Sequence, residues 1–149
     1  MQYSEGHLGR IFMIRVDDGE DLLEAINRFV IGQKIKAGLL LFLGALREGR
    51  LVTGPEQPVI PPVPHFESIT DGWEIFGMGT IYRGDDGNPK IHYHLSAGKK
   101  TAALTGCLRE KALTYLVVEV VLFEFQGIYG KRVADPASGL HIPVLKKEA

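Results

Sequence analysis

The stretch Trp73–Ser96, WEIFGMGTIYRGDDGNPKIHYHLS, decides the fold of this chain. Two strand-like runs, Trp73–Arg83 and Lys90–Ser96, flank the sequence DDGNP at positions 85–89. Aspartate, glycine, asparagine and proline favour turns, because these residues tolerate or impose the backbone angles that a turn requires. We therefore predict that the two runs pair as antiparallel strands joined by this turn.

The second strand of this hairpin carries His92 and His94, and the only cysteine, Cys107, follows in the sequence. Side chains alternate along a strand, so both histidines should lie on one face with Cα atoms about 6–7 Å apart. Two imidazoles and a thiolate form a donor set that zinc favours, and three protein ligands leave a fourth position open. The alternative is a pair of half-exposed strand histidines and a small buried cysteine, with no metal.

The N-terminal part of the chain predicts one strand and one helix. Arg10–Val16 has a strand pattern, and Asp17-Asp18-Gly19 interrupts it and offers a helix cap. Glu20–Lys36 is amphipathic. Its apolar face consists of Leu22, Leu23, Ile26, Phe29 and Val30.

Further strands and loops follow this helix. Leu39–Leu46 is apolar enough for a buried strand, and Glu48-Gly49 resembles a hairpin turn. The proline-rich residues 54–68 and Ser96–Gly106 predict loops, whereas Leu113–Phe125 is the longest strand pattern. We therefore expect an α+β fold: a single domain, residues 1–149, with a mostly antiparallel sheet covered by one main helix.

The composition narrows the class of protein. The chain has 149 residues, 45% of them hydrophobic and 23% charged, which suits one globular domain. Its formal net charge of -1 offers no excess of cations for phosphates, so nucleic acid is an unexpected partner. A single cysteine cannot form an internal disulfide, and the N-terminus lacks the apolar core of a signal peptide. The apolar runs are too short to span a bilayer, so we expect a soluble cytoplasmic protein with no membrane partner.

Several stretches match a known pattern when they are read together. The most specific is the turn that runs into His-x-His at residues 87–94. The others are Arg15–Leu22, Phe42–Ala45, Trp73–Ile75, Gly79–Ile81, Gly106–Leu108, Glu119, Arg132, Asp135, Gly139 and Leu140. Over nearly the whole chain these residues resemble the plants-and-prokaryotes-conserved (PPC) domain, and specifically its stand-alone prokaryotic and archaeal members.

The resemblance implies properties that the spacing of residues does not show. It implies a homotrimer built from an antiparallel sheet domain. In stand-alone microbial members it implies metal ligation by the His-x-His pair and a later histidine, whose place Cys107 takes in this chain. The resemblance therefore implies the ligands His92, His94 and Cys107, and zinc is the expected ion, with other divalent transition metals as alternatives. The AT-hook of the plant relatives, an Arg-Gly-Arg-Pro-type segment, is absent from the sequence, which removes the main reason to expect DNA binding.

Three charged residues complete the candidate site. Glu119 lies inside an apolar strand, where it is either a surface residue or the ion-pair partner of Arg15 or Arg132. The functional alternatives are a hydrogen-bond acceptor for a ligand histidine or a catalytic base acting on metal-bound water. Arg132 either pairs with Asp135 or offers its fork of donors to an anion. Arg15 is the second anion-binding candidate, with an ion pair to Glu119 as its alternative.

Three functional hypotheses follow from these residues. The first is a small zinc-binding protein with an open coordination position, which could extend to a hydrolase or lyase acting on a small anionic metabolite. The second is a DNA-associated or regulatory oligomeric module, by analogy with the plant relatives. The third is a trimer whose metal is purely structural, because four protein ligands would close the site.

Overall fold

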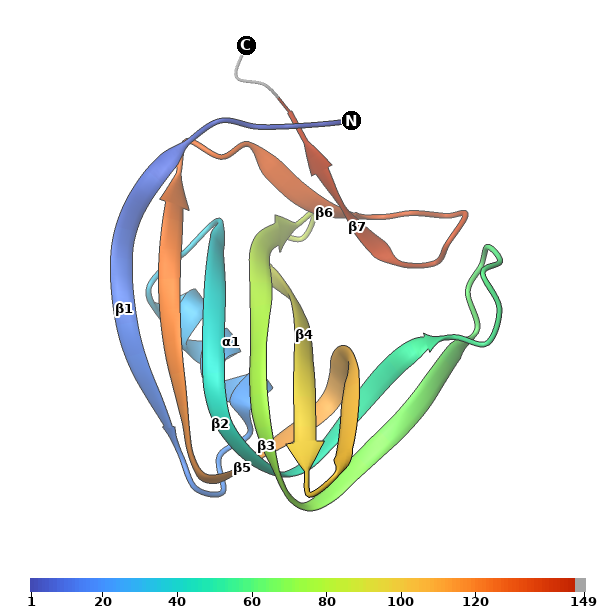
Figure 1. The fold of residues 1–149 in the computed structure, drawn as a ribbon. Coiled ribbons are helices and arrows are strands. Elements are labelled where there is room, and N and C mark those ends of the chain that lie inside the picture. The colour runs from blue at the N-terminus through green and yellow to red at the C-terminus, as the bar shows by residue number, and fades with distance from the viewer. Residues whose placement is uncertain (147–149) are drawn as a thin grey trace.

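The computed structural model describes residues 1–146 as one strongly curved sheet with a single helix (Figure 1). In chain order the elements are β1 (His7–Asp17), α1 (Leu22–Gly32), β2 (Gly38–Pro55), β3 (Pro64–Gly84), β4 (Pro89–Lys99), β5 (Ala102–Gln126), β6 (Gly130–Ala134) and β7 (His141–Leu145). The strand order is β1-β5-β2-β3-β6-β7, and β4 pairs with both β3 and β5. The pairing is antiparallel except between β3 and β6.

Four of the strands close into a ring. β2 lies between β3 and β5, and β4 joins the other edges of those two strands. The strands β2, β3 and β5 are 18, 21 and 25 residues long and bend along their length (Figure 1). The register shifts in both pairings of β2 between Leu46 and Glu48, as expected where bulges bend a sheet. The bend lets the first part of β5 return to the free edge of β4.

The helix is fixed to the sheet at its first turn. Asp21 is the N-cap, and its Oδ1 accepts hydrogen bonds from the backbone amides of Leu23 and Glu24 at 2.9 and 3.1 Å. Its Oδ2 accepts a third hydrogen bond from the backbone amide of Ala112 on β5, at 2.9 Å. One carboxylate therefore both starts α1 and ties it to the longest strand.

The core lies between α1 and the inner face of the curved sheet. Leu22, Ile26 and Val30 are buried on one side of the helix, as their spacing predicts. Most of the other buried apolar residues come from the strands. The predicted combination of an antiparallel sheet with one main helix is confirmed in this form, although the curved strands themselves supply most of the core.

The glycines of β3 allow bulky rings to approach the sheet. Gly77 and Gly79 face inward, and a methyl group on Gly77 would overlap the ring of Phe42. A methyl group on Gly79 would lie 3.0 Å from Leu40 Cδ1 and 3.1 Å from Tyr93 Cδ1. The rings of Phe42 and Tyr93 meet edge to face, with centroids 6.2 Å apart.

Three local predictions were wrong in whole or in part. The loop predicted over residues 54–68 is confined to 56–63, because β2 runs to Pro55 and β3 begins at Pro64. Glu48 and Gly49 do not form a hairpin turn, because β2 continues through them and pairs with Thr70 and Ile69 of β3. Ser96–Gly106 is not a loop, because β4 runs to Lys99 and β5 begins at Ala102. In the last two places, pairing with strands distant in sequence outweighs a local preference for turns. No described helix has both the length and the apolar character that crossing a membrane would require.

Candidate metal centre

The two histidines project from the outer face of β4. Tyr93 and Leu95, which alternate with them, point into the core with exposed fractions of 6% and 2%. The period of a strand therefore turns His92 and His94 away from the core. Cys107 on β5 is the cross-strand partner of His94, so its side chain meets the two imidazoles from the neighbouring strand.

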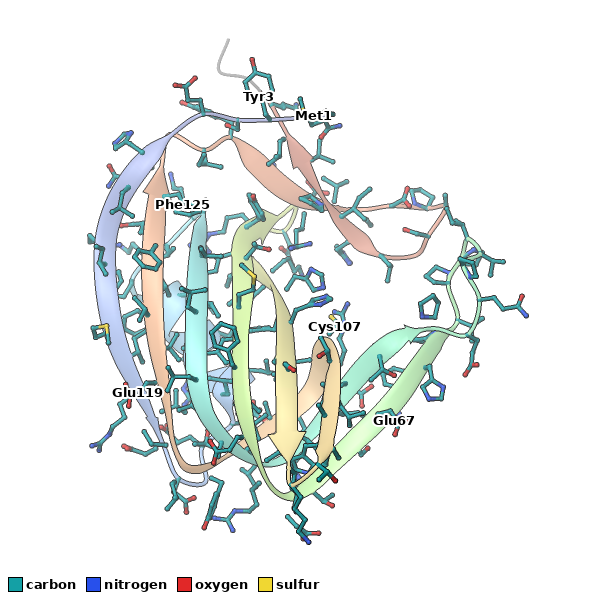
Figure 2. All side chains as sticks on the ribbon, in the orientation of Figure 1. Met1, Tyr3, Glu67, Cys107, Glu119 and Phe125 are labelled. Atoms are coloured by element: carbon teal, nitrogen blue, oxygen red, sulfur yellow. The ribbon has the colours of Figure 1, made fainter. Side chains whose placement is uncertain are left out.

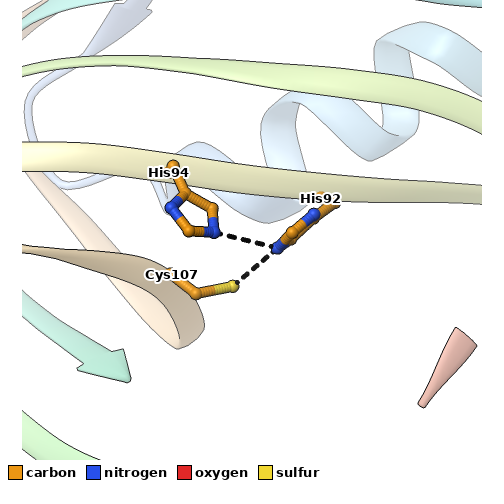
Figure 3. A group of neighbouring side chains, drawn as sticks. All are labelled: His92, His94 and Cys107. Atoms are coloured by element: carbon orange, nitrogen blue, oxygen red, sulfur yellow. Dashed lines mark hydrogen bonds between the residues drawn. The ribbon is translucent and has the colours of Figure 1, made fainter. Parts of the chain in front are cut away.

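The three predicted ligand atoms converge on one point (Figure 3). His92 Nε2 lies 3.1 Å from Cys107 Sγ and 3.2 Å from His94 Nε2, and all three atoms lie within 4.8 Å of one another. Tetrahedral zinc, with bonds of about 2.0–2.3 Å, holds its ligand atoms roughly 3.3–3.8 Å apart. The separations of 3.1 and 3.2 Å are close to this range, and bringing the third, which is at most 4.8 Å, into it needs a side-chain shift of about 1 Å. Two nitrogens with one sulfur suit zinc.

The cluster lies between the protein interior and its surface. Cys107 is buried, His92 is half-buried and His94 is exposed. Within residues 1–146, no further histidine, cysteine or carboxylate belongs to this group. An ion bound by this chain would therefore keep a coordination position for a ligand from outside.

The surroundings of the cluster set the protonation states of its members. Burial lowers the pKa of His92 to about 4, and the charges of Arg132, His94 and Arg109 act in the same direction. His92 is therefore a neutral imidazole at pH 7, which is the form that binds a metal. Burial raises the pKa of the Cys107 thiol, although Arg109 and Arg132 oppose this effect. A metal that binds at neutral pH must therefore displace the thiol proton.

Arg132 lies beside the cluster and does not pair with Asp135. Its guanidinium donates hydrogen bonds to the carbonyl oxygen of His141 at 3.2 Å and to Thr80 Oγ1 at 2.8 Å. Thr80 on β3 is the cross-strand partner of His92. The carboxylate of Asp135 instead accepts hydrogen bonds from Ser138. The predicted ion pair between Arg132 and Asp135 is therefore not formed.

Arg109 is a member of the site that the sequence did not predict. It lies two residues after Cys107 on β5, and its charge lowers the pKa of both Cys107 and His92. On a strand, the spacing of Cys107 and Arg109 puts both side chains on one face, which would have indicated Arg109 as a neighbour of the metal ligands. The prediction of a loop over residues 96–106 left no strand at Cys107 on which to apply this spacing. Without the strand that starts at Ala102, nothing in the sequence places Arg109 next to the histidines.

Glu119 and Arg15 lie elsewhere. They are cross-strand partners on β5 and β1, and both are exposed. Arg15 Nε forms an ion pair with Asp17 Oδ1 at 2.8 Å. Figure 2 shows Glu119 at the side of the sheet formed by β1, and Cys107 on the opposite side of the view, next to β4. Within this chain, therefore, neither residue joins the ligand cluster, because β5 is long and bent and its two halves face different neighbours.

The chain is similar to other proteins both in sequence and in fold. The sequence model of the Plants and Prokaryotes Conserved (PCC) domain matches residues 3–126. A solved structure of a metal-containing protein from Archaeoglobus fulgidus is 24% identical, with a TM-score of 0.83 over 97% of this chain and 99% of that chain. A plant- and prokaryote-conserved protein from Pyrococcus horikoshii is 25% identical, with a TM-score of 0.76 over 95% and 96% of the two chains.

A third solved structure, of a Bacteroides thetaiotaomicron protein described provisionally as DNA-binding, is 22% identical, with a TM-score of 0.75 over 97% of this chain and 99% of that chain. None of the curated proteins matches the sequence significantly. The sequence match covers most of the chain, and the fold agrees with the solved structures over nearly all of it. This chain therefore belongs to the Plants and Prokaryotes Conserved domain family.

Proposed function

We propose that this protein binds one zinc ion through His92, His94 and Cys107 and presents the open coordination position to a small ligand. The observation that carries the proposal is the convergence of three ligand atoms from two strands to within 4.8 Å. The neutral state of His92 supports it, because no proton competes for the nitrogen at pH 7. That the Archaeoglobus fulgidus protein of the same fold is described as metal-containing also agrees with it.

Binding of a ligand is better supported than catalysis. A bound zinc ion would polarise a coordinated carbonyl or phosphoryl oxygen, or acidify a coordinated water. A hydrolase or lyase would also need a general base within hydrogen-bond reach of the reacting group. Glu119, the predicted base, lies exposed on a distant part of β5. The chain's own contribution is therefore to hold the ion and to surround its open side with Arg109 and Arg132.

Metal analysis of protein purified without a histidine tag tests the zinc site. We expect about one zinc per chain in the wild type and almost none in the double variant His92→Ala/His94→Ala. His7→Ala is the matched control, because His7 is an exposed histidine at the start of β1. A double variant that keeps the wild-type zinc content would refute the proposal.

We also propose that the chain assembles as a homotrimer. The exposed outer face of the sheet is apolar, with Met13, Leu43, Phe76 and Met78 between 46% and 71% exposed. The cross-strand register continues from Met13 through Val121, Leu41 and Met78 to His94. Apolar surface of this kind favours protein contacts, and the number of three copies comes from the resemblance to the family. The row of paired residues from Met13 to Met78 ends at the ligand His94. A copy that covered this row would therefore also border the open coordination position.

A further inference from the structure

We propose that Arg132 and Arg109 form a binding subsite for a small oxyanion, a carboxylate or a phosphate, which also coordinates the metal. This inference rests on the proposed zinc site and gives its open position a ligand class. One oxygen of the anion would take the free coordination position, and the others would accept hydrogen bonds from the two guanidinium groups.

The first argument is that Arg132 is a buried charge with no counter-ion among residues 1–146. Its exposed fraction is 6%, and its two hydrogen bonds to described residues go to neutral oxygens, those of His141 and Thr80. Its Nε is buried and has no hydrogen-bond partner in the described part of the chain. Among the described residues, no carboxylate lies within ion-pair distance of Arg132. A buried charge in this state is unfavourable, so an anion from solution would supply what the chain lacks.

The second argument is position. Thr80, which holds one nitrogen of Arg132, is directly opposite His92 in the pairing of β3 with β4. The guanidinium is close enough for its charge to act on both His92 and Cys107. Tyr82 fixes the group from another side, with its ring centroid 5.7 Å from Arg132 Cζ. The unsatisfied cation is therefore held in place next to the ligand cluster.

The third argument is the sum of charge around the open position. Arg109 lies two residues after Cys107 on β5, so strand alternation puts the two side chains on one face, and the charge of Arg109 lowers the pKa of Arg132. A zinc ion bound by one thiolate keeps one positive charge, so with both arginines the centre would carry about three. Guanidinium forks bind carboxylates and phosphates through paired hydrogen bonds, and zinc accepts an oxygen ligand. A small oxyanion satisfies all three groups at once.

The two arginines would contribute differently. Arg132 is buried and already held by two hydrogen bonds, so its geometry is fixed before the anion arrives. Arg109 is exposed, and its side chain already contacts the Cys107 thiol, so it would meet the bound anion from the solvent side. Loss of Arg109 should therefore weaken binding without disturbing the fold, which makes it the safer residue for a test.

Calorimetric titration of the zinc-loaded protein with inorganic phosphate, and in a second arm with acetate, tests the subsite. A parallel titration of cobalt-substituted protein follows the visible spectrum of the ion, which changes when an anion coordinates it. We expect one of the two anions to bind and to shift the spectrum, and the arm that responds identifies the anion class. We expect Arg109→Met and Arg132→Lys each to weaken that binding at least tenfold with zinc content unchanged.

Lys131→Met is the matched control, because it removes a neighbouring cation that is exposed and lies 3.9 Å from Asp85. Its anion affinity should equal that of the wild type. The subsite is refuted if zinc-loaded protein ignores both anions, or if both arginine variants bind as tightly as the wild type. A wild-type protein that takes up no zinc would overturn the proposed function as well. The two failures can be distinguished, because zinc content is measured before any anion is added.

Discussion

His94 and Cys107 are directly opposite each other in the pairing of β4 with β5. Directly opposed side chains on antiparallel strands have Cβ atoms about 4.5–5.5 Å apart, so the thiol and the imidazole share one space. A slip of one residue in this register would turn Cys107 to the other face of the sheet. The candidate metal centre therefore depends on the closure of β4 onto β5 as much as on the identity of its ligands.

Gly106→Ala should damage the metal site through this register. A methyl group on Gly106 would overlap the carbonyl oxygen of Val52, and Val52 is the β2 partner of Cys107. We expect a loss of about 1–3 kcal/mol in the free energy of unfolding and weaker zinc binding. Gly98→Ala is the control, because nothing lies within 4 Å of a methyl group there. Equal zinc affinity in both variants, measured by competition with a chelator, would contradict this role for the register.

The third ligand can be tested by exchanging its donor atom. We expect Cys107→Ser to lower zinc affinity by at least about a hundredfold, because a neutral hydroxyl is a poor zinc ligand. Cys107→His supplies a third imidazole and should keep most of the affinity, which chelator competition would measure. In cobalt-substituted protein, the thiolate-to-metal absorption band should be present only when Cys107 is intact. If Cys107→Ser binds zinc as tightly as the wild type does, the sulfur is not a ligand.

Asp21→Ala should destabilise the fold without touching the site. The substitution removes the helix N-cap and leaves the Ala112 amide of β5 without its acceptor. We expect a loss of about 2–3 kcal/mol in the free energy of unfolding, measured with denaturant. Asp21→Asn keeps the capping oxygen and should lose less. Identical stabilities of the two variants would show that the carboxylate does not tie α1 to β5.

The Arg10–Glu124 pair predicts a pH dependence of stability. Arg10 Nε and Glu124 Oε2 are 2.7 Å apart, and a second nitrogen of Arg10 donates to Oε1 at 3.0 Å. The hydrogen bond from Arg10 holds the pKa of Glu124 below its ordinary value. A carboxylate with a lowered folded pKa stabilises the fold above its unfolded pKa of about 4.3, and the effect is lost as the pH falls through the folded value.

Glu124→Gln should therefore be less stable than the wild type at pH 7, and the difference should shrink below about pH 4. Denaturant unfolding at several pH values measures this difference. Glu119→Gln, an exposed substitution on the same strand, serves as the control and should change stability little at either pH. A Glu124→Gln deficit that is constant with pH would mean that the ion pair does not cause it.

Phe76→Glu should dissociate the proposed trimer. Phe76 is 64% exposed in the middle of the apolar outer face, and a carboxylate there would be desolvated by a neighbouring copy. We expect light scattering to give a trimeric mass for the wild type and a monomeric mass for the variant. Ile31→Glu places the same charge on the exposed side of α1 and should leave the trimer intact. A monomeric wild type would refute the assembly.

The features that could be predicted from the sequence are those with local causes. The turn at 85–89 and the strands on either side of it follow from residues that prefer those conformations. The buried face of α1 follows from apolar spacing. Glu48-Gly49 and Ser96–Gly106 were misjudged because their local preference for turns is weaker than the hydrogen bonds they form with distant strands.

By itself, the sequence determined the face of β4 on which His92 and His94 lie, because strand periodicity is a local property. Only the tertiary structure decided that Cys107 meets them, that Arg109 and a buried Arg132 lie beside them, and that Glu119 lies apart. These relationships depend on how β5 bends and pairs along its 25 residues. Such pairing is fixed by contacts between segments far apart in the chain, which no short pattern of residues encodes.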